Sequence, residues 1–188
     1  MDPKTKNLAI AIFIYVVSAV ISFFVFSNIS GGGGNIATPL AQPTTGTDQR
    51  VSFNDTLPKT EECPINGVRY SKPQRQWWEK HRPLGVMIEN HQDSRPQSGM
   101  TYADVTYEAV AEGGITRFLN VFYCQDAGIV GPVRSARTYF LDFISEYGDY
   151  PLYAHVGGAN TSGPADALGQ ISDYGWQLYN DLNQFAIG

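Results

Sequence analysis

The chain has 188 residues, with 13 lysines and arginines against 18 aspartates and glutamates, and its net charge at pH 7 is −5. Nucleic-acid binding requires a basic surface, so this acidic composition excludes a nucleic acid as the partner. Any binding site for an anion must therefore be a local cluster of basic residues.

An almost unbroken apolar run extends from Leu8 to Ser27. About 20 apolar residues cross a bilayer as a helix, so the run predicts a single transmembrane anchor. Lys4 and Lys6 precede the run and no basic residue follows until Arg50, which predicts a cytoplasmic start (residues 1–7) and an extracytoplasmic remainder. A cleaved signal peptide is the alternative, although its apolar core is usually only about 7–15 residues long.

A stretch rich in Gly, Thr, Pro, Gln, Asn and Asp occupies residues 28–62. Such a composition cannot bury enough apolar surface to offset the entropy of ordering, so we predict a flexible linker. The exported domain then comprises residues 63–188. It contains Cys63 and Cys124, which are either joined in a disulfide or present as two buried thiols.

Two β-rich runs, residues 105–111 and 115–123, flank Gly113-Gly114 and predict a β-hairpin. Shorter apolar runs at residues 84–88 and 152–156 predict two buried strands.

A helix is predicted over residues 135–147, with Ser135 as its N-cap and Gly148 as its stop. Phe140, Leu141 and Ile144 form its apolar stripe, and a second, short helix is expected over residues 165–171. Strands and helices interleave, which predicts an α/β or α+β fold with a small mixed sheet and flanking helices.

Three arginines suggest an anion site. Arg134 and Arg137 lie where the turn at Gly131-Pro132 leads into the predicted helix, and Arg117 lies on the second hairpin strand. Guanidinium groups bind phosphates and carboxylates, and a helix N-terminus adds free N–H groups and a positive dipole end. We predict that these arginines, with Ser135, bind an anion.

Carboxylates on the partner strand of the hairpin are candidates for binding a divalent cation or for acid–base chemistry. They are Asp104, Glu108 and Glu112. Mg²⁺ is expected only if the protein is an enzyme, and no other cofactor is predicted.

The alternative to a ligand site is a purely structural set of ion pairs. In that case Arg117 pairs with Glu108 across the hairpin, and Arg137 pairs with Asp142 or Glu146 along the helix.

His155 lies at a strand end before Gly157-Gly158, where the missing side chains would let a ligand approach. It is either a site residue or a core histidine bonded to a carbonyl. The spacing of the histidines and cysteines does not fit a zinc site, so no metal is predicted on them.

Six motifs follow one another from residue 87 onward: MIENH at 87–91, SRPQSG at 94–99, ADVTYE at 103–108, AEGGITRF at 111–118, GPVRSAR at 131–137 and YAHVGG at 153–158. Together they resemble the YerB-like family of bacterial envelope lipoproteins, over about residues 83–188. The resemblance implies a membrane-attached extracytoplasmic protein and a shared fold, but no activity. The chain differs from the family in its predicted transmembrane anchor, which replaces a lipidated cysteine. It also lacks the later part of the family domain, with a Pro-His-Asn motif, so we expect the domain to be truncated at its C-terminus.

Two functional hypotheses follow. The first is a non-catalytic binding or scaffolding module of the cell envelope, anchored in the cell membrane as a single-pass protein, which recognises an anionic envelope component or an envelope protein. The second is an envelope enzyme acting on a phosphorylated glycolipid or cell-wall precursor. We favour the first because no catalytic group is identified in the sequence.

Overall fold

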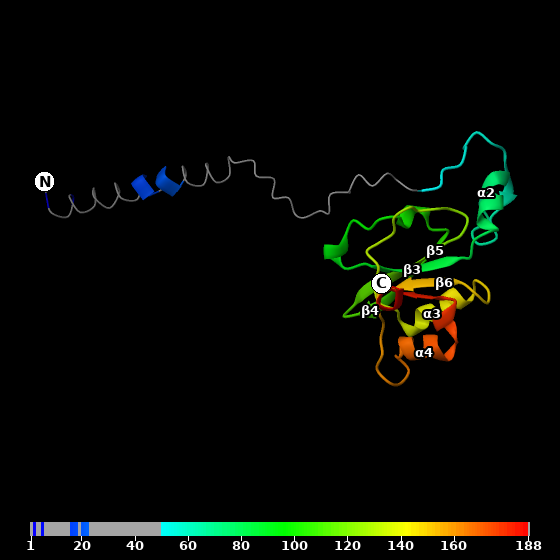
Figure 1. Cartoon of the computed structure of the whole chain (residues 1–188). Coiled ribbons are helices and arrows are strands. Elements are labelled where there is room, and N and C mark those ends of the chain that lie inside the picture. Colours follow the sequence, from blue (N-terminus) through cyan, green and yellow to red (C-terminus); the bar gives the residue numbers. More distant parts are fainter. Residues whose placement is uncertain (1, 3–4, 6–15, 19, 23–49, 188) are drawn as a thin grey trace. The chain divides into compact units, whose positions relative to one another are not determined.

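The computed structural model describes residues 2, 5, 16–18, 20–22 and 50–187 (Figure 1). The chain divides into two compact units, Met1–Thr45 and Gly46–Gly188. In the first unit, residues 16–18 and 20–22 are helical, and the rest of the predicted anchor from Leu8 to Ser27 lies outside the described residues. Within the described part of the chain, no helix has the length and apolar character needed to cross a membrane.

A five-stranded mixed sheet forms the centre of the second unit, in the order β4-β5-β3-β6-β7. Its strands are β3 (Leu84–Glu89), β4 (Val105–Glu112), β5 (Ile115–Phe122), β6 (Leu152–His155) and β7 (Asp181–Asn183). β5 is antiparallel to both β3 and β4, whereas β6 is parallel to β3 and β7. The predicted mixed sheet, its hairpin and its two buried strands are confirmed, and the fold is α+β.

The hairpin turn lies at Gly113 and Gly114, whose φ angles are 59° and 79°. Two successive residues with positive φ form the tight turn that matches the twist of paired strands, and glycine adopts them without strain. The pairing register of β4 shifts between Val110 and Glu112, just before this turn.

Helices α3 (Thr138–Ser145) and α4 (Ala167–Asp173) cover one face of the sheet (Figure 1). The apolar stripe predicted for α3 is confirmed: Phe140, Leu141 and Ile144 are buried against the sheet. On the opposite face, the short helical turn η2 (Met100–Tyr102) and the loop after β5 pack against the sheet. Another short turn, η1 (Gln92–Ser94), follows β3.

The first of these helices begins later than predicted, at Thr138 and not at Ser135. The preceding segment is extended because its N–H groups bind neighbouring strands: Arg134 N–H donates to the carbonyl of Met87, and Ala136 N–H to that of Gly157. Arg137 is the N-cap, and no side chain caps this helix end.

A small unit at the start of the domain combines β1 (Lys59–Glu62), β2 (Arg69–Ser71) and α2 (Lys72–Trp78). β1 lies inside the range predicted as linker, because its antiparallel pairing with β2 orders a sequence of low apolar content. A disulfide between Cys63 and Cys124 joins this unit to the end of β5 and decides the question that the sequence left open. Trp78 packs beside the disulfide, and 2% of its surface is exposed.

The C-terminal part contains η3 (Trp176–Leu178), the edge strand β7 and a last helical turn, α5 (Gln184–Ile187). The predicted second helix is confirmed as α4, displaced by two residues toward the C-terminus.

Candidate functional site

The three arginines predicted from the sequence lie together at the carboxyl end of β3. Arg117 is paired in register with Glu89, the last residue of that strand. The extended segment before α3 forms an antiparallel bridge from Val133 to Ile88, which sets Arg134 opposite Met87 and lets its side chain reach Glu89. Non-local strand pairing therefore assembles the site.

Glu89 is the residue that sequence reasoning missed. Its Oε2 accepts from Arg134 Nε at 2.6 Å, and its Oε1 accepts from the backbone N–H groups of Asn90 and His91 at 3.0 and 3.1 Å. Burial raises the pKa of Glu89, but the hydrogen bonds from Arg134 and the two N–H groups, with the charge of Arg117, outweigh burial and hold the pKa below its usual value of 4.5. The signal in the sequence that could have identified Glu89 is its charge at the end of an otherwise apolar, buried strand.

Glu112 bridges the other two arginines. One of its oxygens contacts Arg117 Nη2 at 3.0 Å, and the other contacts Arg137 Nη2. Arg117 is buried and also donates from Nη1 to the carbonyl oxygen of Ser135. Burial lowers the pKa of Arg117, and Glu89 opposes this shift. Three arginines and two glutamates thus form one connected network.

The structural ion pairs considered from the sequence are not the ones that form. Arg117 binds Glu112 instead of Glu108. Arg137 also binds Glu112, instead of Asp142 or Glu146. Glu108 instead accepts from the hydroxyl group of Thr116 at 2.6 Å. Ser135 contributes its backbone carbonyl to the network.

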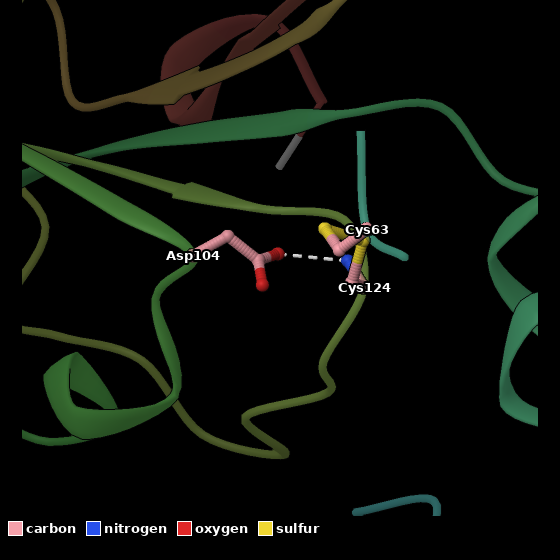
Figure 2. A group of neighbouring side chains, drawn as sticks. All are labelled: Cys63, Asp104 and Cys124. Atoms are coloured by element: carbon pink, nitrogen blue, oxygen red, sulfur yellow. Dashed lines mark hydrogen bonds between the residues drawn. A yellow bond between two sulfur atoms is a disulfide. The ribbon is translucent and has the colours of Figure 1, made fainter. Parts of the chain in front are cut away.

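The carboxylates predicted as a cation or acid–base set are not brought together. Asp104 and Glu112 lie eight positions apart along the extended β4 segment, roughly 27 Å at the usual strand rise. Asp104 accepts from the backbone N–H groups of Tyr123 and Cys124, both at 2.7 Å. Figure 2 shows the bond from Cys124. Burial raises the pKa of Asp104 against these hydrogen bonds. Mg²⁺ binding stays a prediction.

Asp104 lies close to both cysteines, as Figure 2 shows. The two sulfur atoms are bonded to each other. A disulfide supplies no thiolate for a metal, so the role of Asp104 is to fix the backbone beside the bridge.

His155 is a buried core histidine bonded to a carbonyl, which is the second of the two roles considered for it from the sequence. Its Nδ1 lies 2.7 Å from the carbonyl oxygen of Gly157, and its Nε2 lies 2.6 Å from Asp181 Oδ1 on the edge strand β7. A carbonyl can only accept, so Nδ1–H donates to Gly157, and the contact with Asp181 fixes the orientation of the ring.

The glycine pair after His155 serves packing. A Cβ on Gly158 would lie 2.8 Å from Leu168 Cδ2 and 3.1 Å from Ala136 Cβ. Close approach of α4 and the extended segment therefore explains this glycine, without invoking a ligand.

Unused hydrogen-bonding capacity remains next to the arginines. Within the described part of the chain, the buried Arg117 Nε has no hydrogen-bond partner, and the buried hydroxyl of Tyr153 has no acceptor for its proton. Burial raises the pKa of Tyr153, while the backbone N–H of Arg137 and the charges of Arg117 and Arg137 act in the opposite direction. Arg134 remains 57% exposed although its Nε binds Glu89.

Comparison with known proteins gives a consistent result. The family model described as "Protein of unknown function (DUF3048) N-terminal domain" matches residues 70–175. A relative in Bacillus subtilis (strain 168), named "Putative lipoprotein YerB", is 38% identical over 109 residues, which are 58% of this chain and 31% of the relative. The crystal structure of the Bacillus subtilis YerB protein matches with a TM-score of 0.55 and 33% identity, over 68% of this chain and 39% of that one. The chain thus spans about a third of the length of the relative, and the predicted YerB-like resemblance is confirmed.

Proposed function

This chain belongs to the family of the DUF3048 N-terminal domain, and from that premise we propose that it is a membrane-attached, extracytoplasmic binding module of the bacterial envelope. Its ligand is an anionic envelope component, held by Arg134, Arg137 and the N-terminus of α3. The apolar run from Leu8 to Ser27 anchors it in the membrane as a single-pass protein with a cytoplasmic N-terminus.

Two features support this location. The relative in Bacillus subtilis is named as a lipoprotein, a class of protein attached to membranes. The Cys63–Cys124 disulfide suits an oxidising compartment outside the cytoplasm.

The observation that carries the proposed activity is the local excess of positive charge in an acidic chain. Three arginines face two glutamates at an uncapped helix N-terminus, where the dipole also favours an anion. The free N–H groups of the exposed Arg134 are then available to a ligand.

Titration calorimetry on the full chain in detergent tests this proposal, with inorganic pyrophosphate and soluble cell-wall fragments as probes. We expect binding to wild type and a loss of at least about tenfold in affinity in the Arg134→Ala/Arg137→Ala variant, because two charged donors are removed. Arg69→Ala removes an exposed charge on β2 and is the control. Equal binding by all three proteins contradicts the proposal.

A further inference from the structure

The two carboxylates of the arginine network are held very differently. Glu89 ends a central strand, its side chain is 12% exposed, and it accepts from two backbone N–H groups as well as from Arg134. Glu112 lies beside the hairpin turn, its side chain is 54% exposed, and its contacts within the described structure are with Arg117 and Arg137. Glu89 is therefore a fixed counter-ion, whereas Glu112 is held only by the two arginines.

The way in which Glu112 is bound matches the recognition of a phosphate group. Each of its oxygens contacts a different guanidinium group, one on β5 and one at the N-cap of α3. A terminal phosphate presents two oxygens in the same manner, carries up to two charges, and has a third oxygen to spare.

Unpartnered buried groups at the same corner match that third oxygen. In the described residues, Arg117 Nε is buried without a hydrogen-bond partner and the buried Tyr153 hydroxyl has no acceptor for its proton. The hydroxyl oxygen faces the backbone N–H of Arg137 and the charges of both bridging arginines. The eight-residue helix α3 also has no side-chain cap. A carboxylate leaves these donors unused, while a larger anion has more oxygens to offer them.

We propose that the Glu112 carboxylate is an internal occupant of a phosphate site, and that a terminal phosphate or diphosphate displaces it from Arg117 and Arg137. This inference rests on the proposed anion-binding function and names its ligand class. With three arginines against two glutamates the network carries +1, and release of Glu112 leaves +2, which matches a phosphate dianion. The glycine turn that follows Glu112 allows the hairpin tip to move away.

The test measures phosphate affinity in the full chain in detergent, for wild type, Glu112→Gln and the control Glu108→Gln. Glu108 lies on the same strand and is bonded to Thr116. Inorganic pyrophosphate and soluble short-chain phosphatidic acid are the probes, so that a free phosphate is distinguished from a lipid headgroup. We expect about tenfold tighter binding to Glu112→Gln, because no carboxylate competes for the two arginines. Glu108→Gln should bind as wild type does.

Other outcomes separate this inference from the proposed function. Binding of equal or lower affinity in Glu112→Gln overturns the displacement but leaves the anion site in place. Absence of binding in every protein overturns both. Hydrogen exchange in wild type gives a second readout should the variant not fold: pyrophosphate should speed the exchange of the Gly113 and Gly114 amides, and unchanged exchange contradicts the displacement.

Discussion

Glu89 is the residue on which the geometry of the arginine cluster depends. It orients Arg134 and lies 3.9 Å from Arg117, which is buried and needs a counter-charge. Without the Glu89 carboxylate, the buried Arg117 keeps only the more exposed Glu112 as a counter-charge within the described residues, and a buried charge that loses part of its compensation destabilises the fold.

Glu89→Gln should therefore destabilise the domain by about 2 kcal/mol at pH 7. The folded-state pKa of Glu89 is lower than its ordinary value of 4.5, so the ionised carboxylate stabilises the fold above that pH. The contribution is lost as the pH falls through the lowered folded-state pKa. Urea unfolding of wild type and variant between pH 7 and pH 3 measures it.

Glu108→Gln is the control, since Glu108 is exposed and accepts only neutral hydrogen bonds, from Thr116 at 2.6 Å and from Asn90 at 3.5 Å, with no ion pair to the arginines in the described residues. A stability difference between wild type and Glu89→Gln that stays constant down to pH 3 contradicts the role given to Glu89.

Among the elements, the β1–β2–α2 unit is joined to the central sheet by the disulfide and by aromatic contacts. Cys63 and Cys124 are 61 positions apart, and Trp78 packs over them. Gln74 of α2 also donates to the carbonyl of Cys124 at 2.8 Å. The bridge closes a long loop, which restricts the unfolded chain strongly.

Cys63→Ser/Cys124→Ser should lower the free energy of unfolding by about 4 kcal/mol on the chain-entropy estimate for a loop of this length. Thermal unfolding followed by tryptophan fluorescence measures the loss, and wild type treated with a reductant should show the same effect. A stability equal to that of oxidised wild type shows that the bridge contributes nothing.

The elements that the sequence predicted are those determined by local patterns. The alternation of residues and Gly113-Gly114 specify the hairpin, and the apolar stripe specifies α3. The start of α3 was misplaced because the N–H groups of Arg134 and Ala136 bind the carbonyls of Met87 in β3 and of Gly157 just after β6, which are distant in sequence. Glu89 was missed for the same reason, since its partner Arg134 lies 45 positions away.

At the scale of the whole molecule, the acidic chain concentrates positive charge in one network. The overall charge of −5 opposes long-range attraction of anions, so a ligand must be bound by direct contacts with the arginines. This requirement favours a small, highly charged group over an extended anionic surface.

The most direct test of the central claim is an NMR titration of the arginine side-chain Nε–H signals with inorganic pyrophosphate, in the full chain in detergent. We expect saturable shifts of the Arg117, Arg134 and Arg137 signals, with a single dissociation constant. Arg69 and Arg75, which lie in β2 and α2, should not move. Absence of shifts, or equal shifts at all five arginines, would show that the network is structural and that the ligand must be sought elsewhere.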